Sequence, residues 1–391
     1  MHVSQTVQAA RLFLKYPAFM RHLAAYKVQS YKRYCWTLKN PDKDGRVPPP
    51  LIYKLTLNQA CDLRCPMCFL WGEEGVYTSE DKKPVPHELD WQLAQKVILE
   101  AERTGKHHSF ILSGGEALLY SRFKDLANLL KERRAFTSII TNGGGIGKHL
   151  DVIEDNPYLS FYVSLDGTKE VNEVLRGKGV YEKVTNNIKR LKAFRRPPYV
   201  AILFTLQPEN VGVLYETCRE LVNIGVDRVL INLRWNLSKA QGDAYERQLQ
   251  EDFGARAWTH KGYITPSYPV STREFITQYE KIKKARWAVH ISSYLRKPED
   301  LDVYINEGHR NPYNNFCYKQ WLRMDVLTDG QVTPCYPYPD LKFDNLADKS
   351  IDQIWNGEPY KRFRQYIRKK SLPVCSKCCA LYLYDKNRMM L

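Results

Sequence analysis

The chain has 391 residues, of which 43% are hydrophobic, and a formal charge of +16. This length suffices for about two domains with a sizeable apolar core. No stretch reaches the roughly 18 to 20 consecutive apolar residues of a membrane span, and no signal-peptide pattern opens the chain. The ten cysteines are therefore expected to be reduced, in a cytoplasmic protein, rather than paired in a secreted disulfide framework.

The first 40 residues contain no Asp or Glu and mix basic with aromatic and aliphatic side chains. The pattern predicts a helical segment interrupted at Pro17, where a second helix should start. Three uses stay open: packing on the main domain with solvated lysines, peripheral contact with an anionic membrane, or contact with an acidic substrate or nucleic acid. The basic residues are Arg11, Lys15, Arg21, Lys27, Lys32, Arg33 and Lys39.

After the Pro48-Pro49-Pro50 linker, β-rich runs alternate with helical patterns, which is typical of a parallel α/β domain. Six βα units in series predict a partial (β/α)6 TIM-like barrel with ligands at the carboxyl ends of the strands. The predicted strands are Ile52–Asn58, Ser109–Leu112, Ser138–Thr141, Phe161–Leu165, Val200–Leu206 and Val229–Leu233. The predicted helices are Trp91–Thr104, Phe123–Arg134, Tyr181–Phe194 and Val211–Ile224.

Beyond Ser238 the alternation is lost, and a charged helical stretch over Ser271–Lys297 leads to a second region with cysteines. The turn Thr328-Asp329-Gly330 predicts a hairpin there, and a terminal helix is expected around Ile351–Lys369. The predicted parts are an N-terminal helical extension (1–47), the barrel core (48–237), a helical bridge (238–315) and a small C-terminal domain (316–391).

The motif Cys61-x-x-x-Cys65-x-x-Cys68 directly follows the first predicted strand. Three thiolates on one loop leave a fourth coordination position open. On a four-iron cluster, the open iron can chelate the amino and carboxylate groups of S-adenosylmethionine (SAM). Zinc is the alternative, because a distant fourth ligand could complete its site, although structural zinc motifs favour paired Cys-x-x-Cys units.

Short polar motifs follow the next three predicted strands. In Gly114-Gly115-Glu116, the glycines let a ligand approach the backbone, and the carboxylate can accept a hydrogen bond from an ammonium group. Because a barrel presents its ligand contacts at these strand ends, further candidates come from the third and fourth strands. These are Asn142, Ser164 and Asp166.

The order of these motifs over Leu51–Leu233 resembles the radical SAM superfamily. The resemblance implies an enzyme whose catalytic [4Fe–4S] cluster on Cys61, Cys65 and Cys68 reductively cleaves SAM to a 5′-deoxyadenosyl radical, which abstracts hydrogen from a substrate. It also implies an electron donor such as flavodoxin or ferredoxin. The implied SAM contacts are Met67 beside the adenine, Gly114, Gly115 and Glu116 at the methionyl amino group, Ser164 and Asp166 at the ribose hydroxyls, and Arg176 at the carboxylate, with Asn142 as a further candidate.

Two positions depart from the usual pattern of that superfamily, and one has a simpler explanation. Ala117 stands where proline is common, and Met67 replaces a more frequent aromatic residue. Backbone shape and apolar cover are what these sites need, so both should be tolerated. Arg176 could instead form a surface salt bridge.

A second group of cysteines lies in the C-terminal region: Cys317, Cys335, Cys375 and Cys378. Spacing alone leaves a zinc ribbon and a fully ligated cluster equally open. The sequence from Met324 to Cys335 and around Ile351 resembles the SPASM and twitch extensions of radical SAM enzymes. That resemblance implies one auxiliary iron–sulfur cluster, expected to be of the [4Fe–4S] type, and leaves open whether Cys378 or the adjacent Cys379 is its ligand.

The sequence does not specify the net reaction, and oxidation, epimerisation and dehydration all remain open. We expect a small polar or anionic substrate of carbohydrate type, which suits the positive charge. A lipid or lipid-linked substrate and a peptide are alternatives, the peptide being disfavoured because no separate peptide-recognition domain precedes the barrel. No specific nucleic-acid partner is expected. A non-enzymatic zinc protein that binds nucleic acid is the competing class.

Overall fold

The computed structural model describes residues 5–40, 46–73, 75–78, 88–105, 108–265, 267–285, 287, 289–307, 317–378 and 381. Cys379 lies outside the described residues. The strands are β1 Ile52–Asn58, β2 Ser109–Gly114, β3 Thr137–Thr141, β4 Leu159–Ser164, β5 Tyr199–Leu206, β6 Arg228–Leu233, β7 His290–Ser293, β8 Arg323–Val326 and β9 Val332–Thr333. The helices are α1 Gln5–Lys15, α2 Pro17–Lys39, α3 Trp91–Thr104, α4 Phe123–Glu132, α5 Leu150–Glu154, α6 Lys169–Arg176, α7 Val180–Lys192, α8 Leu214–Ile224, α9 Lys239–Phe253, α10 Thr272–Lys284, α11 Asp300–Asn306, α12 Ile351–Trp355 and α13 Glu358–Lys369.

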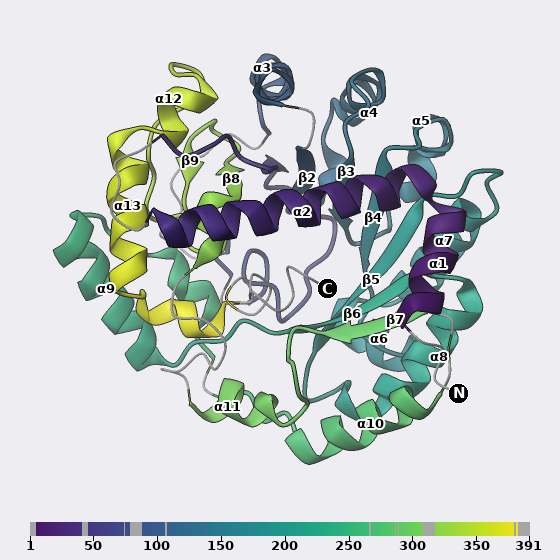
Figure 1. The fold of residues 1–391 in the computed structure, drawn as a ribbon. Coiled ribbons are helices and arrows are strands. Elements are labelled where there is room, and N and C mark those ends of the chain that lie inside the picture. Colours follow the sequence, from purple (N-terminus) through teal and green to yellow (C-terminus); the bar gives the residue numbers. More distant parts are fainter. Residues whose placement is uncertain are drawn as a thin grey trace.

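All nine strands form one sheet in the order β7-β6-β5-β4-β3-β2-β1-β8-β9. Neighbouring strands from β7 through β1 to β8 are parallel, and only the β8–β9 pair is antiparallel. Helices surround the sheet, and α2 runs across one end of it (Figure 1). Among the described strands, β7 and β9 stand at opposite ends of this order and do not pair with each other, so the barrel is partial, as predicted.

Every residue of β1 is buried. Tyr53, Leu55 and Leu57 belong to the main apolar core. The alternate residues Lys54 and Thr56 are also buried and lie on the opposite face, because side chains alternate along a strand. One face of β1 therefore packs under the helices, and the other supplies polar groups to the inside of the partial barrel.

Three elements of the barrel region were not predicted. The helix α5 has five residues and α6 has eight, so their apolar periodicity is too short to detect. The four-residue strand β7 carries mostly polar side chains, yet it pairs in parallel with β6. The predicted bridge therefore contains an edge strand of the sheet as well as helices.

The C-terminal region continues the sheet of the barrel. β8 pairs in parallel with β1, with Ile52 opposite Arg323. The predicted hairpin is confirmed, since β9 folds back on β8 through a turn in which Gly330 has a φ of 77°. The expected terminal helix is divided into α12 and α13, because the helical conformation is interrupted at Gly357, which has an extended backbone.

The predicted helix pair at the N-terminus is confirmed, with α1 ending just before Pro17. α2 lies on the amino ends of the strands. His22 hydrogen-bonds Ser109 at the start of β2 at 2.7 Å, and Arg33 donates to the backbone oxygen of Trp321, before β8, at 2.8 Å. This end is opposite to the carboxyl ends where the predicted site lies.

Asp227, which precedes β6, joins α1 to the barrel. Its carboxylate accepts hydrogen bonds from the Tyr16 hydroxyl at 2.9 and 2.8 Å and from the Val200 N–H at 2.9 Å. It also pairs with Lys15 at 3.0 Å and with Lys192. Burial lowers the pKa of Lys192 to about 8, while the Asp227 carboxylate opposes this decrease. Asp227 thus compensates a buried cation and fixes the first helix.

Replacing Asp227 with Ala is expected to lower the free energy of unfolding by about 3 to 5 kcal/mol, because the buried charge of Lys192 would lose its carboxylate partner. Thermal and chemical unfolding midpoints measure this change. The matched control is Asp151→Ala, which removes an exposed pair with Lys124 at 2.6 Å and should cost about 1 kcal/mol or less. Equal losses in the two variants would contradict this role of Asp227.

Candidate functional site

The first three cysteines lie on the loop that leaves β1. The loop is ordered by its own backbone, since Cys68 N–H donates to Cys65 O at 2.9 Å and Gly72 N–H donates to Cys68 O at 2.7 Å. The thiols of Cys61 and Cys65 both interact electrostatically with that of Cys68. The structure therefore brings the three predicted ligands together at the carboxyl end of the sheet.

Burial changes the proton affinity of two of these thiols. Burial raises the pKa of Cys61 to about 11 and also raises that of Cys65. Such thiols are protonated at neutral pH, and a soft metal would have to displace their protons, which couples metal affinity to pH. Three thiol donors on one loop suit an iron–sulfur cluster with one open iron.

The glycines Gly114 and Gly115 hold the end of β2 tightly against this loop. A Cβ added at Gly114 would lie 2.3 Å from the backbone oxygen of Asn58, and one at Gly115 would lie 2.3 Å from that of Ala60. Gly115 N–H donates to Asn58 O at 3.0 Å and Glu116 N–H donates to Ala60 O at 2.8 Å. Gly114 also has a φ of 149°, which favours glycine. The backbone arrangement therefore requires glycine at both positions.

Glu116 is completely buried beside the cysteine loop. Its Oε1 accepts hydrogen bonds from the Thr141 hydroxyl at 2.6 Å and from Leu118 N–H at 3.0 Å, and its Oε2 accepts from Asn142 N–H at 2.6 Å. Burial raises the pKa of Glu116 to about 7, although these bonds oppose the rise. A cationic ligand would favour the ionised carboxylate.

Asn142 connects the end of β3 to the cysteine loop. Its side-chain amide donates to the Asp62 carboxylate at 2.7 Å, and its carbonyl oxygen accepts from Gly144 N–H at 2.8 Å. Two other residues predicted to contact SAM are partly exposed to solvent. Met67 lies on the loop between Cys65 and Cys68, and Ser164 is the last residue of β4. Asp62 was not predicted as a site residue, although its position beside Cys61 in the sequence was an available signal for that role.

Asp166 and Arg176 form a buried ion pair. Asp166 Oδ2 accepts from Arg176 Nε at 2.8 Å and lies 2.6 Å from a terminal guanidinium nitrogen, while Oδ1 accepts from Thr205 N–H at 2.6 Å. Burial raises the pKa of Cys65, and the Arg176 guanidinium opposes this rise. Arg176 thus places a fixed positive charge near the cysteines, and Asp166 orients it.

Several buried polar atoms inside the partial barrel have no hydrogen-bond partner among the described residues. They include Thr56 Oγ1 and Asn58 Oδ1 on β1 and Asn232 Oδ1 on β6. Leaving a buried polar atom unpaired costs about 1 to 3 kcal/mol, so such atoms usually have a ligand or water partner. The interior is therefore suited to a polar ligand. None of these three residues was predicted, because a single polar residue inside a strand gives no sequence motif.

The C-terminal cysteines also lie together. Electrostatic interactions connect Cys375 with Cys317, Cys335 and Cys378, and Cys378 with Cys317 and Cys335. Burial raises the pKa of Cys317 to about 11 and that of Cys335 to about 12. Among the described residues, no three or more His, Cys, Asp or Glu side chains converge to hold a single metal ion. A cluster does not need such convergence, since each cysteine binds a different iron.

Asp325 on β8 holds the segment that carries Cys335. Its carboxylate lies 2.7 Å from Lys319 Nζ and 2.7 Å from Arg323 Nε, and it accepts a hydrogen bond from Tyr336 N–H at 3.1 Å. Lys319 also donates to Pro334 O at 2.6 Å. The positive neighbours hold the pKa of Asp325 well below its usual range, although burial alone would raise it. The two charged residues of the short strand β8, Arg323 and Asp325, were the available signal for this role.

Aromatic rings connect the two groups of cysteines. Phe69, which follows Cys68, stacks on Tyr263 with ring centroids 4.7 Å apart and meets the edge of Tyr336 at 6.4 Å. Tyr336 follows Cys335, and Lys54 Nζ lies 3.0 Å from its ring centroid. The two cysteine segments are thus packed against each other through side chains at the carboxyl end of the sheet.

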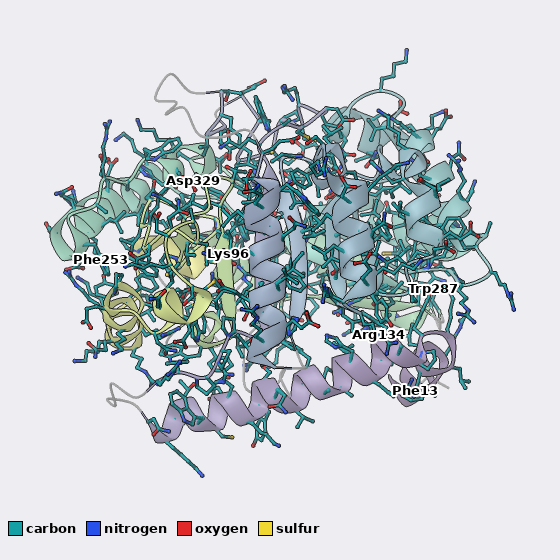
Figure 2. The ribbon with its side chains drawn as sticks, turned by 90° about the horizontal axis from the view of Figure 1, so that it is seen from above. Phe13, Lys96, Arg134, Phe253, Trp287 and Asp329 are labelled. Carbon is teal, nitrogen blue, oxygen red and sulfur yellow. The ribbon has the colours of Figure 1, made fainter. Side chains whose placement is uncertain are left out.

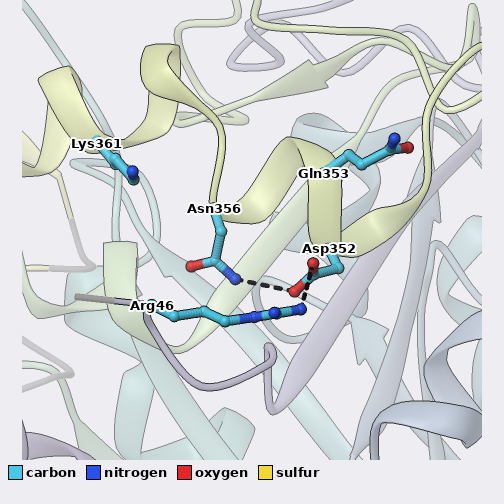
Figure 3. Close-up of a pocket in the computed structure, with 5 residues that line it drawn as sticks. All are labelled: Arg46, Asp352, Gln353, Asn356 and Lys361. Carbon is cyan, nitrogen blue, oxygen red and sulfur yellow. Dashed lines mark hydrogen bonds and ion pairs between the residues drawn. The ribbon is translucent and has the colours of Figure 1, made fainter. Parts of the chain in front are cut away.

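A separate surface pocket of about 250 Å³ is lined by Arg46 and by residues of the α12–α13 region (Figure 3). An ion pair of 2.5 Å between Arg46 and Asp352 crosses it, and both side chains are exposed. None of the predicted site residues lines this pocket. We therefore do not assign the chemistry to it.

Comparison with known proteins agrees with this arrangement. The Radical SAM superfamily model matches residues 55–221, and the SPASM model, an iron–sulfur cluster-binding domain, matches residues 317–379. The chain is 24% identical over 352 residues to the tungsten-containing aldehyde ferredoxin oxidoreductase cofactor-modifying protein of Pyrococcus furiosus, covering 83% of this chain and 86% of that protein. It is 24% identical over 348 residues to the PqqA peptide cyclase of Xanthomonas euvesicatoria, covering 81% and 77%.

The fold is similar to that of SuiB from Streptococcus suis, solved with its precursor peptide SuiA, at a TM-score of 0.59 and 17% identity. The similarity covers 90% of this chain and 73% of that chain.

Replacing Asp325 with Ala should leave the charges of Lys319 and Arg323 without their carboxylate partner. This should lower the free energy of unfolding by about 3 to 5 kcal/mol. It should also loosen the Cys335 segment and lower the iron bound per chain after anaerobic reconstitution. Denaturant midpoints and iron analysis measure both effects. The control is Asp344→Ala, which removes an accessible pair with Lys349 at 2.6 Å. Wild-type iron content in the Asp325 variant would contradict the positioning role.

Proposed function

Since the chain belongs to the radical SAM superfamily and carries a SPASM-type iron–sulfur domain, we propose that this enzyme modifies a peptide by abstracting hydrogen from an unactivated carbon. Its cofactors are SAM and iron–sulfur clusters. When bound, the catalytic cluster would supply the one electron needed to cleave SAM to methionine and a 5′-deoxyadenosyl radical. The family assignment replaces the alternative of a non-enzymatic zinc protein.

The observation that carries the proposal is the convergence of the Cys61 loop with Gly114, Gly115 and Glu116. In this assignment Cys61, Cys65 and Cys68 bind the catalytic cluster. The backbone at the two glycines admits the methionyl end of SAM. The ammonium group of SAM would donate a hydrogen bond to the Glu116 carboxylate. The donors of Thr141 and Asn142 hold this carboxylate in place.

The remaining SAM contacts follow from the same strand ends. Ser164 would meet a ribose hydroxyl, and Met67 would cover the adenine. Arg176 would pair with the methionyl carboxylate, since its guanidinium is charged and lies near the cysteine loop. Because both oxygens of Asp166 are already engaged, we assign it to positioning Arg176 rather than to direct ribose contact. The Cys317, Cys335, Cys375 and Cys378 group would hold the auxiliary cluster.

A peptide is the substrate class that the comparisons favour over the expected carbohydrate. One relative is named a peptide cyclase, and a solved structure of the same fold contains a precursor peptide. Both similarities extend over most of this chain. The peptide would bind at the carboxyl ends of the strands, between the barrel and the C-terminal region. A one-electron donor such as flavodoxin or ferredoxin remains a prediction.

The affinity for SAM should depend on Glu116 and on pH. With its pKa near 7, the carboxyl group is ionised above that pH and protonated below it, so lowering the pH from 7.5 to 6.0 should weaken SAM binding by up to about tenfold. Anaerobic equilibrium dialysis of iron-loaded protein measures the dissociation constant.

Glu116→Gln should bind SAM more weakly and lose the pH dependence. The matched control is Glu73→Gln, an exposed carboxylate on the same loop, which should behave as wild type. Iron content is checked at each pH. A wild-type affinity that is equal at both pH values would exclude the proposed role of Glu116.

Deuterium transfer can identify the substrate class. Iron-loaded enzyme, SAM and a reductant are incubated with a deuterated cell extract, half of which is first digested with protease that is then inactivated. A peptide substrate predicts deuterium in 5′-deoxyadenosine with the intact extract and little with the digested one. Undiminished transfer after digestion would reject a peptide and return the carbohydrate-type substrate to first place.

A further inference from the structure

Exposed apolar side chains are concentrated on the N-terminal helices. The described chain exposes six large hydrophobic side chains, and five of them lie on α1 and α2. Their exposed fractions are 83% for Leu14, 52% for Val28, 51% for Leu38, 47% for Phe13 and 41% for Tyr31. Clustering of this kind marks an interaction surface, whereas single exposed apolar residues need no explanation.

These residues belong to the outward face of α2 and the adjoining part of α1. On α2, exposed positions recur at intervals of three or four residues, as on one face of a helix. They include Pro17, Arg21, Ala24, Val28, Tyr31, Lys32, Leu38 and Lys39. The opposite face carries Ser30, Arg33 and Thr37, which are buried against the barrel. The helix pair along one edge of the molecule, with Phe13 labelled, is visible in Figure 2.

The charge of this surface has a single sign. No Asp or Glu occurs in the first 40 residues, and the exposed face includes Arg11, Arg21, Lys32 and Lys39. Basic residues beside exposed aliphatic and aromatic side chains on a helix are the composition that lies in the interface of an anionic bilayer. No helix among the described residues has both the length and the apolar character needed to cross a membrane.

We propose that the outward face of α1 and α2 docks the enzyme on an anionic membrane surface. The helices are fixed to the barrel by Asp227 with Tyr16, and by Arg33 with the oxygen of Trp321, so the whole enzyme would follow them. Leu14 and Val28 would enter the headgroup region, while Arg21, Lys32 and Lys39 meet lipid phosphates and carboxylates.

Docking in this way determines which end of the barrel faces the bilayer. α2 covers the amino ends of the strands, where His22 contacts Ser109 and Arg33 contacts the segment before β8. The cysteine loop follows the carboxyl end of β1, at the opposite end. The membrane would therefore hold the enzyme with its site facing away from the lipid, and the helix pair would not deliver a lipid to the site.

Vesicle flotation with the full-length, iron-loaded protein tests the proposal. Phosphatidylcholine vesicles with phosphatidylserine should bind the protein, and pure phosphatidylcholine vesicles should bind it far less. Binding should weaken as salt is raised, because salt screens the surface charges. The combined variant Arg21→Glu, Lys32→Glu and Lys39→Glu should lose at least about fivefold in affinity for each basic residue removed.

Two further variants separate docking from a general loss of exposed apolar area. Leu14→Ser with Val28→Ser should weaken vesicle binding severalfold, whereas Val174→Ser, at the exposed apolar residue on α6, should not. Iron content and SAM affinity should stay at wild-type values in all of them. The proposal would be overturned by absence of binding to anionic vesicles, or by binding to duplex DNA without binding to vesicles. Wild-type vesicle binding by the triple Glu variant or by the Leu14→Ser, Val28→Ser variant would also overturn it.

Discussion

The close approach of the β1 and β2 ends is the constraint on which the site depends. Gly114 and Gly115 let β2 come so near to the Asn58–Ala60 segment that any side chain would collide with backbone oxygens. This contact aligns the start of the cysteine loop with Glu116. The hydrogen bonds from Thr141 and Asn142 to Glu116 connect the end of β3 to this contact. Asn142 also donates a hydrogen bond to Asp62 on the cysteine loop. A larger residue at either glycine would separate the thiols from the carboxylate.

The second cysteine group is part of the same structural unit as the first. β8 pairs with β1, so the strand that leads to Cys335 is fixed beside the strand that leads to Cys61. The buried charges around Asp325 hold the Cys335 segment, and the contact of Phe69 with Tyr336 closes the space between the two groups. Replacement of one charged partner would therefore affect both stability and cluster loading.

The sequence was informative where local chemistry repeats and uninformative where a role depends on distant contacts. The six predicted strands lie within about two residues of those observed at each end, because their buried runs are long and their turns are marked by glycine and polar residues. β7 was missed because four mostly polar residues give no period. Cys61, Cys65 and Cys68 were predicted as cluster ligands from their spacing, and the C-terminal cysteines from a family resemblance, but Asp325 and Asp62 have contacts that only the fold creates. Similarly, the engagement of Asp166 with Arg176 and Thr205 could not be read from their separation in the sequence.

The most direct test of the central claim is the formation of 5′-deoxyadenosine by reconstituted protein incubated anaerobically with SAM, dithionite and the peptide fraction that supports deuterium transfer. The comparison is a Cys61→Ala, Cys65→Ala and Cys68→Ala variant whose C-terminal cysteines still bind iron. Formation by the wild type alone is the predicted result. Equal formation by the variant, or none by fully iron-loaded wild type with that fraction, would contradict the assignment of the catalytic cluster to these three cysteines.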